Sequence, residues 1–200
     1  MKLEEILGKI KGADAAAMKQ AGKRWKSVAK PLFSLGKLED AVIRIAGIRK
    51  TADVVLKKKG LVILCADNGV VEEGVTQTGQ EVTAVVAENF TRHAASVCMM
   101  SEVAGADLFP VDIGMAVDVP GLTKPEYKVA FGTRNMAREP AMTREQAEQA
   151  VLTGIRLAGE LSEQGYDILA TGEMGIGNTT TSSAVASVLL DCDPEKVTGR

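Results

Sequence analysis

The segment that decides the fold runs from Asp167 to Thr181 and reads Asp-Ile-Leu-Ala-Thr-Gly-Glu-Met-Gly-Ile-Gly-Asn-Thr-Thr-Thr. Its apolar start, over residues 166–170, predicts a short buried strand. The glycines that follow permit a tight turn, and a side-chain oxygen of Asn178 or of the next threonines suits the N-cap of a helix over 179–190. Free N–H groups at the start of such a helix suit a phosphate or a carboxylate. From spacing alone, a plain connecting turn explains the glycines equally well.

The same segment imitates the loop that binds nucleoside triphosphates. Gly172 and Gly177 are separated by four residues, as in that motif, but Asn178 stands where the motif needs lysine. The contact from an ammonium group to the terminal phosphates is therefore missing. On this ground we exclude an NTPase.

Strand and helix patterns alternate through most of the chain. The continuous apolar run at 60–66 is typical of a strand buried on both faces. The pattern further predicts a helix over 81–104, a strand that starts at Ala106 and ends at Asp112, a short strand over 128–131, and a helix that begins at a capping box of Thr143 and Gln146. This alternation predicts an α/β fold with a doubly wound, mostly parallel sheet and helices on both faces.

The N-terminal part has a different character. Residues 2–29 are helical in pattern, and a second helix is expected to begin at Ser34 and to close at the lysines of 57–59. We therefore divide the chain into an N-terminal helical segment, 1–59, and a parallel α/β nucleotide-binding domain, 60–200.

Acidic residues stand at the ends of the predicted strands. In doubly wound sheets, ligands bind beyond the carboxyl ends of the strands. Asp67, Asp112 and Glu173 each occupy such an end, so we expect them to converge on one crevice beside the glycine turn. For Asp112 a purely structural role as a turn or cap residue fits equally well. Phosphate repels a carboxylate, so Glu173 is expected to accept hydrogen bonds from sugar hydroxyls.

Composition excludes several classes of function. The net charge is −2 and aromatic residues make up 4%, which argues against nucleic-acid binding. No apolar run is long enough to span a membrane, and charges near the start argue against a signal peptide, so a cytoplasmic protein is expected. The only histidine, His93, excludes a histidine-based triad and a multi-histidine metal site. Three cysteines, an odd number, are expected to be reduced core residues: Cys65, Cys98 and Cys192.

Several segments, in order, resemble one enzyme family. They are Lys30–Glu39, Asp67–Val75, Glu81–Ala84, Pro140–Thr143 and Gly172–Thr180. Each segment alone is a weak signal, but their order together is similar to that of the nicotinate-nucleotide:dimethylbenzimidazole phosphoribosyltransferases. The resemblance extends from about residue 25 to the end of the chain.

The resemblance implies transfer of phosphoribose from nicotinate mononucleotide to an aromatic base in cobalamin biosynthesis. By that analogy Glu173 addresses the ribose, no cofactor or metal takes part, and the protein is a homodimer. The analogy assigns the nucleotide phosphate to Gly175, Ile176, Gly177, Asn178 and Thr179. It assigns the pocket of the incoming base to Thr78, Val86 and Met174.

The chain also departs from the family pattern. Asn68 stands where the family often has histidine, and Val86 where some members have glutamine, so the accepted base could also be a phenol or a purine. The resemblance implies a general base, a glutamate, in a C-terminal part beyond Arg200, so no catalytic residue is expected in this chain. The α/β domain is thus expected to be incomplete and the chain inactive alone. The alternative is a non-catalytic nucleotide-binding or assembly module.

Overall fold

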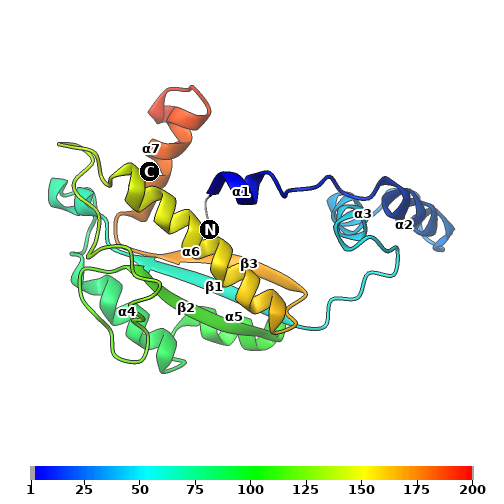
Figure 1. The fold of residues 1–200 in the computed structure, drawn as a ribbon, viewed down its shortest axis with the longest axis horizontal. Coiled ribbons are helices and arrows are strands. Elements are labelled where there is room, and N and C mark those ends of the chain that lie inside the picture. The colour runs from blue at the N-terminus through cyan, green and yellow to red at the C-terminus, as the bar shows by residue number, and fades with distance from the viewer. Residues whose placement is uncertain (1–2, 200) are drawn as a thin grey trace. The chain divides into compact units, whose positions relative to one another are not determined.

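The computed structural model describes residues 3–199 and divides the chain into two compact units, the first ending at Lys57 and the second running from Lys58 onward (Figure 1). This division lies close to the sequence-based boundary at 59/60. The first unit is helical and the second is α/β, and each is described by itself below. None of the helices within residues 3–199 combines the length and the apolar character needed to cross a bilayer.

The last residue, Arg200, lies outside the described residues. The predicted α/β domain includes Arg200, and the general base implied by the resemblance would lie beyond it. The position of that base, and the inactivity expected of the chain without it, therefore stay predictions.

The helical unit contains α1 (Leu3–Leu7), α2 (Ala15–Ser27) and α3 (Lys37–Arg49). Helix α2 begins where Asp14 caps it by accepting a hydrogen bond from the Ala17 N–H at 2.7 Å. Contrary to expectation, α3 begins after Gly36 rather than at Ser34, and it ends at Arg49 rather than near residue 57. It ends there because Lys50 takes the left-handed conformation, and its N–H caps the carbonyls of Ala46 and Gly47.

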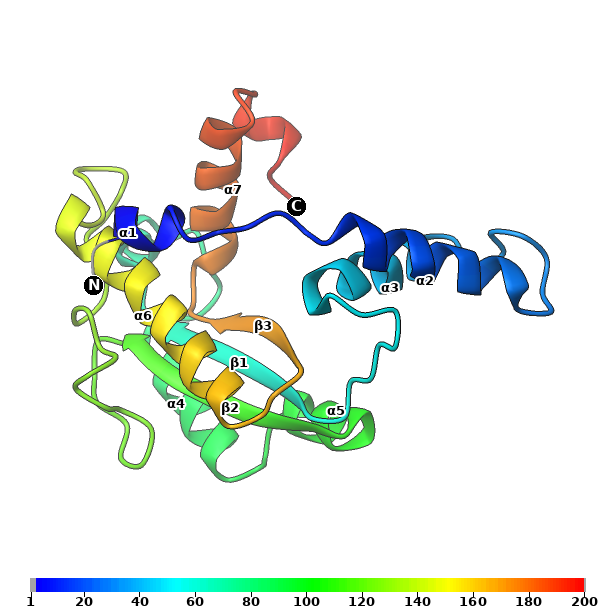
Figure 2. The ribbon, with the colours of Figure 1, turned by 45° about the vertical axis from the view of Figure 1, so that its right-hand side comes forward.

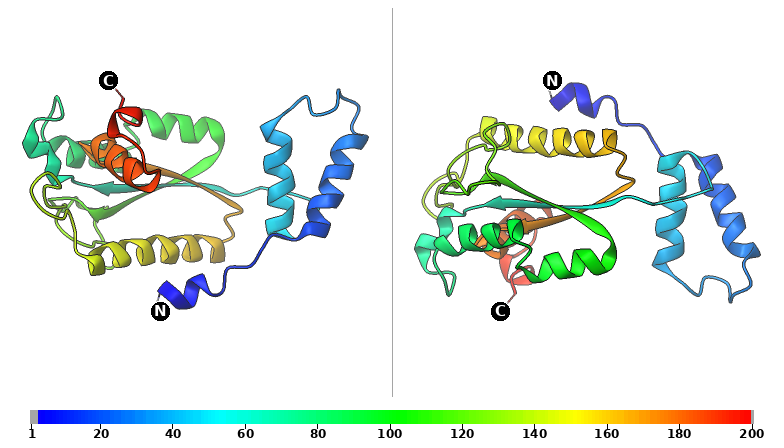
Figure 3. Two further views of the ribbon diagram at one scale, coloured as in Figure 1. Left: turned by 90° about the horizontal axis from the view of Figure 1, so that it is seen from above. Right: turned by 90° about the horizontal axis from the view of Figure 1, so that it is seen from below.

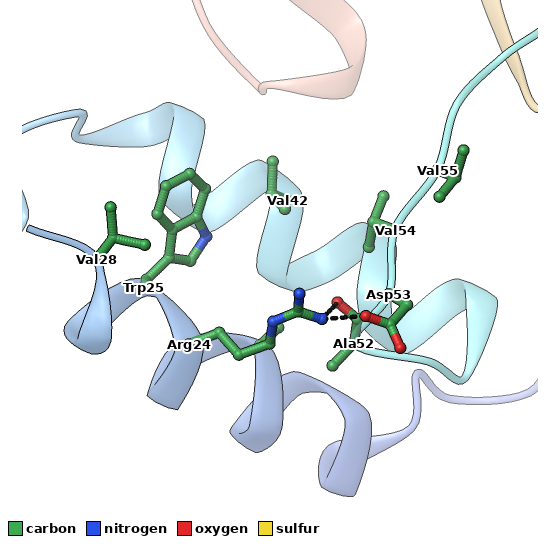
Figure 4. A pocket seen from close by; sticks show the side chains of 9 residues that line it. Arg24, Trp25, Val28, Val42, Ala52, Asp53, Val54 and Val55 are labelled. Atoms are coloured by element: carbon green, nitrogen blue, oxygen red, sulfur yellow. Dashed lines mark hydrogen bonds and ion pairs between the residues drawn. The ribbon is translucent and has the colours of Figure 1, made fainter.

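Helices α2 and α3 pack together beside a cavity of about 320 Å³ (Figure 4). At its rim the Arg24 guanidinium donates to the Ala52 carbonyl at 3.1 Å and to the Asp53 carboxylate. A second contact holds the start of α3. Lys30 donates to the buried Glu39 carboxylate at 2.6 Å, and this hydrogen bond holds the pKa of Glu39 below its ordinary value.

The α/β unit is built on a three-stranded parallel sheet in the order β2-β1-β3 (Figure 2). Its strands are β1 (Lys59–Ala66), β2 (Ala106–Gly114) and β3 (Ile168–Met174). The connections carry η1 (Gly69–Glu73), α4 (Glu81–Thr91), α5 (Ser96–Ala104) and α6 (Arg144–Glu163); α7 (Asn178–Leu189) and η2 (Pro194–Lys196) follow β3. The predicted parallel α/β fold is confirmed.

The two faces of the sheet bury different side chains, because successive residues of a strand point to opposite sides. On one face Ile63 and Cys65 pack with Phe90 of α4 and Cys98 of α5. On the other face Val62 and Val111 pack against α6. Figure 3 shows α6 on the opposite side of the sheet from α4 and α5. The sheet is therefore covered on both faces, as the alternation of elements predicts.

Three details of the predicted elements are wrong. The expected helix over 81–104 is two helices, because the chain turns between Thr91 and Ser96 with His93 in the left-handed region. Residues 128–131 form no strand, although the Val129 N–H donates to the Ile113 carbonyl at 2.9 Å. Strand β3 starts at Ile168 and continues past residue 170 to Met174, because pairing with β1 carries it through Gly172. None of its residues is buried, contrary to the expected buried strand.

Candidate functional site

The glycine turn lies between β3 and α7, at the carboxyl end of the sheet. Gly175 is buried, and a Cβ atom placed there would lie 2.0 Å from the Ala66 carbonyl oxygen. Gly177 has φ +85° and forms the N-cap of α7, a conformation that favours glycine. These two glycines are therefore required by close packing and by backbone conformation, and they let the start of α7 approach the end of β1.

Hydrogen bonds fix the path of this turn. The Ile176 N–H donates to the Thr83 hydroxyl of α4 at 3.0 Å, and the Ile176 carbonyl accepts from Asn68 Nδ2 at 3.1 Å. The Asn178 N–H donates to the Gly175 carbonyl at 3.0 Å, and the Thr179 N–H to Asn178 Oδ1 at 2.8 Å. The turn is thus held by side chains from α4 and from the residues after β1, which lie far away in the sequence.

Only some of the predicted amides stay available to a ligand. Those of Ile176, Asn178 and Thr179 already have partners within the chain. The N–H groups of Gly177 and Thr180 have no acceptor among residues 3–199. The expectation of a fully open row of amides is therefore too broad. Among the N-cap and first turn of α7, the unpaired donors are the N–H groups of Gly177 and Thr180.

The expected convergence of three carboxylates is wrong. Asp112 pairs with Cys65, which also pairs with Met174, so these side chains share the face covered by α4 and α5. Glu173 pairs with Leu64 and points to the face covered by α6, where it is exposed. The one-residue offset in register separates the carboxylates.

Both aspartates have structural partners. Asp112 is fully buried and accepts hydrogen bonds from the Met115 N–H at 2.8 Å, the Thr123 hydroxyl at 2.7 Å and the Lys128 ammonium at 3.0 Å. Asp67 accepts from the Ala116 N–H at 2.8 Å through Oδ2, while its buried Oδ1 has no partner within residues 3–199. Asp112 therefore fixes the loop that follows β2, which agrees with the structural alternative for this residue.

The predicted base-pocket residues are only partly brought together. Val86 and Met174 pack against the same apolar cluster, on the face of the sheet covered by α4 and α5. Thr78 lies in the loop before α4, where it is exposed and its carbonyl accepts a hydrogen bond from the Thr76 hydroxyl at 2.7 Å. Two of the three residues therefore contact one apolar cluster.

Residues of η1, the segment that follows β1, pack against the turn. Asn68 is the N-cap of η1, and a Cβ atom on Gly177 would lie 3.0 Å from a methyl group of Val71 in η1. Glu73, at the end of η1, accepts hydrogen bonds from Asn135 at 2.6 Å and from Arg138 at 2.9 Å. The Asn135 hydrogen bond and the nearby Arg138 charge hold the pKa of Glu73 below its ordinary value.

The cysteines and acidic groups of residues 3–199 give no sign of a metal centre. No group of three histidine, cysteine, aspartate or glutamate side chains in the described part of the chain could hold a metal ion. Cys65 and Cys98 are buried, as predicted, and burial raises the pKa of Cys65 to about 12, which keeps it a neutral thiol. Cys192 is also a free thiol but is only half-buried, so it is not a core residue.

One cavity of the α/β unit lies away from the turn. It measures about 340 Å³ and lies between β2, the loop after it and α6. The Tyr127 hydroxyl, at its wall, donates to Glu160 at 2.6 Å, and this hydrogen bond raises the pKa of Tyr127. No residue of the turn lines this cavity.

Comparison with known proteins identifies the family. A family model described as phosphoribosyltransferase matches residues 10–200. The chain belongs to this phosphoribosyltransferase family. It is 47% identical over 198 residues to the nicotinate-nucleotide–dimethylbenzimidazole phosphoribosyltransferase of Clostridium tetani, covering 99% of this chain and 55% of the relative. It is 42% identical over 200 residues to the enzyme of that name from Alkaliphilus metalliredigens, covering 100% of this chain and 57% of the relative.

A solved phosphoribosyltransferase has the same architecture. The crystal structure of the nicotinate-nucleotide–dimethylbenzimidazole phosphoribosyltransferase from Thermus thermophilus superposes with a TM-score of 0.82 at 38% identity. The match covers 91% of this chain and 56% of that structure. The chain therefore spans a little over half the length of the family members that it matches.

Two residues that hold the turn, Asn68 and Thr83, were not predicted. Each lies in one of the segments that resemble the family, but a local pattern cannot show that its side chain reaches Ile176 across about a hundred residues. The only signal at Asn68 was its departure from the histidine that the family often carries. Contacts between residues so far apart in the sequence depend on how the strands pair in the folded chain.

Proposed function

We propose that this chain provides the nucleotide-binding part of a phosphoribosyltransferase that moves phosphoribose from nicotinate mononucleotide to 5,6-dimethylbenzimidazole or a related aromatic base. The products are nicotinate and the α-linked nucleotide. The observation that carries the proposal is the turn after β3, where a buried glycine and a left-handed glycine place unpaired N–H groups at the start of a twelve-residue helix. The names of the relatives with which the chain aligns over nearly its whole length supply the substrates.

The turn binds the 5′-phosphate of nicotinate mononucleotide. Residues Gly175 to Thr179 surround it, and the Gly177 and Thr180 N–H groups donate to its oxygens. The Thr179 N–H now bonds to the side chain of its neighbour Asn178, and a phosphate oxygen can replace that acceptor. Anchoring the phosphate holds the sugar so that its C1′ atom faces the incoming base, a gain that comes from position rather than from acid or base chemistry.

The reaction exchanges one bond to C1′ for another. The bond to the pyridinium nitrogen breaks, and its electron pair stays on that nitrogen, which becomes neutral in free nicotinate. A benzimidazole nitrogen forms the new bond from the opposite face, which inverts the configuration. The other benzimidazole nitrogen then gives up its proton to a base. We assign that base to no residue up to Arg200, and a general base contributes ~10²–10⁴-fold to a rate.

The remaining roles follow the position of each side chain. Val86 and Met174 form an apolar wall that suits a flat aromatic base, and Thr78 lies in the loop that leads to α4. Glu173, one residue before Met174, is exposed and accepts hydrogen bonds from the ribose hydroxyls.

A steady-state assay of nicotinate release tests the proposal. We expect the 200-residue chain to bind nicotinate mononucleotide but to release little nicotinate. A chimera that adds the unmatched C-terminal part of the Clostridium tetani relative should turn over. A chimera that binds but never turns over would favour the alternative, a non-catalytic nucleotide-binding or assembly module.

A further inference from the structure

Asn68 occupies an unusual position for a helix-capping residue. It stands at the N-cap of η1 with extended backbone angles, yet its side chain makes no cap hydrogen bond to η1. Asparagine at such a position ordinarily accepts from an N–H of its own helix. Here the amide group extends instead to the turn between β3 and α7, so its hydrogen-bonding capacity is used on a distant segment.

Both ends of the Asn68 amide contact that segment. Nδ2 donates to the Ile176 carbonyl at 3.1 Å, and Oδ1 lies 3.3 Å from the Thr181 hydroxyl, whose single proton is shared with the Asn178 carbonyl at 2.9 Å. The Asn68 main-chain carbonyl accepts from Gln80 Nε2 at 3.1 Å, which fixes the residue from the side of α4. One side chain therefore connects the end of β1 to the turn and to the first turn of α7.

The contact to the Ile176 carbonyl sets the direction of the next N–H. In a trans peptide the C=O and the following N–H point to opposite sides of the peptide unit. When Asn68 binds the Ile176 carbonyl, the Gly177 N–H must point away from Asn68. Thr83 fixes the preceding peptide unit in the same way, because its hydroxyl accepts from the Ile176 N–H at 3.0 Å. The unpaired Gly177 donor is therefore aimed by two side chains that bind Ile176.

From this geometry we infer that Asn68 is a positioning residue for the phosphate group. It holds the Ile176–Gly177 peptide in the orientation in which Gly177 donates to phosphate, and it need not touch the ligand. The inference rests on the proposed function and goes beyond it, because it assigns the preorganisation of the turn to one amide side chain. Loss of Asn68 should weaken binding of the phosphate group and leave binding of the aromatic base unchanged.

Calorimetry on the 200-residue chain with three probes tests this inference: inorganic phosphate, nicotinate mononucleotide and 5,6-dimethylbenzimidazole. For Asn68→Ala we expect the Kd of both phosphate-bearing probes to rise about tenfold, the equivalent of one hydrogen bond, with the Kd of the base within about twofold. Asn68→Asp keeps the acceptor for Thr181 but sets a carboxylate against the Ile176 carbonyl. It should weaken the phosphate probes at least as much.

Asn135→Ala is the matched control. Asn135 is buried, whereas Asn68 is half-buried, and it likewise uses one donor and one acceptor, toward Glu73 and the Ala137 N–H rather than toward the turn. This variant should lose thermal stability like Asn68→Ala, but its Kd for phosphate should stay within about twofold of that of the parent chain. A role of Asn68 in stability alone predicts equal effects of the two variants on all three probes.

The outcomes separate the two proposals. If the parent chain binds neither phosphate nor nicotinate mononucleotide, the proposed function fails, and this inference fails with it. If the parent chain binds both while Asn68→Ala binds them equally well, or loses affinity for the base by the same factor, only the positioning role fails.

Discussion

The carboxyl ends of β2 and β3 lie at the same end of one parallel sheet, but the polar groups there differ in whether they have hydrogen-bond partners. Near the end of β2, both carboxylate oxygens of the buried Asp112 have donors, and the loop that follows is fixed by those bonds. Beyond β3, the turn is held at Ile176 while the Gly177 and Thr180 donors have no acceptor within residues 3–199. Satisfied groups stabilise a fold, whereas unpaired donors at a helix start can bind an anion.

Gly175→Ala, which changes the turn after β3, should have the largest effect on ligand binding and stability. The added Cβ would lie 2.0 Å from the Ala66 carbonyl oxygen, so backbone must move and the turn must change its path. We expect loss of detectable nicotinate mononucleotide binding and a fall in the unfolding free energy of roughly 3 kcal/mol. Calorimetry and urea denaturation measure the two quantities.

Gly74→Ala is a useful control for this prediction. Gly74 lies at the end of η1, where an added Cβ would meet no atom within 4 Å, although its φ of +68° costs some backbone strain. This variant should lose some stability and keep its affinity for nicotinate mononucleotide. Unaltered binding by Gly175→Ala would show that the turn does not hold the ligand.

Lys128→Met tests the other region of this comparison, the end of β2. Lys128 is 8% exposed and donates to the fully buried Asp112 at 3.0 Å, so its removal leaves a buried carboxylate without its counter-charge. We expect the unfolding free energy to fall by about 3 kcal/mol, the lower end of the range for such a loss, because two other donors stay. Urea denaturation measures the change.

The exposed Lys124, on the same loop, provides the control. Lys124→Met should change the unfolding free energy by less than about 0.5 kcal/mol. In both variants the folded chain should bind nicotinate mononucleotide with the parent Kd, because Asp112 and Glu173 lie on opposite faces. A loss of ligand affinity in Lys128→Met alone would mean that the two strand ends are coupled.

The fold follows from the sequence where strands are buried on both faces. The apolar runs before Asp67 and Asp112 predict two strands correctly, because they are short and rich in branched aliphatic residues. The capping box of Thr143 and Gln146 is also confirmed at the start of α6. Local signals of this kind specify an element because they act within a few residues.

Other features depend on information that no local pattern carries. The break between α4 and α5 contains neither glycine nor proline, and both helices share one apolar period, so they appear as one. The separation of Asp112 from Glu173 depends on strand register, which is set by pairing with β1. The role of Asn68 depends on a contact across 108 residues.

Glu173→Ala tests the end of β3, where the ribose is proposed to bind. Removing an acceptor of ribose hydroxyls should raise the Kd of nicotinate mononucleotide about tenfold, since a hydrogen bond to a charged group contributes ~1.5–3 kcal/mol. The Kd of the benzimidazole should change little. Calorimetry with each ligand alone gives both numbers, and equal losses for the two ligands would argue against a ribose contact.

The smallest expected effect concerns pH. The Asn135 hydrogen bond and the Arg138 charge depress the pKa of Glu73 in the folded chain below its ordinary 4.5. Stability from this carboxylate is therefore present above pH 4.5 and is lost as the pH falls through the folded pKa. Thermal melts of the parent chain and of Glu73→Gln should thus converge on acidification. A difference in Tm that stays constant from about pH 7 to about pH 3 would contradict this linkage.

The central claim is that the nucleotide phosphate binds at the turn between β3 and α7. Backbone-amide NMR during titration with nicotinate mononucleotide, and then with inorganic phosphate, tests it most directly. We predict that both ligands shift the Gly177 and Thr180 amide resonances most, with smaller shifts at Thr179. Saturable binding that leaves these amides unmoved, or that shifts residues around the cavity between β2 and α6 instead, would contradict it.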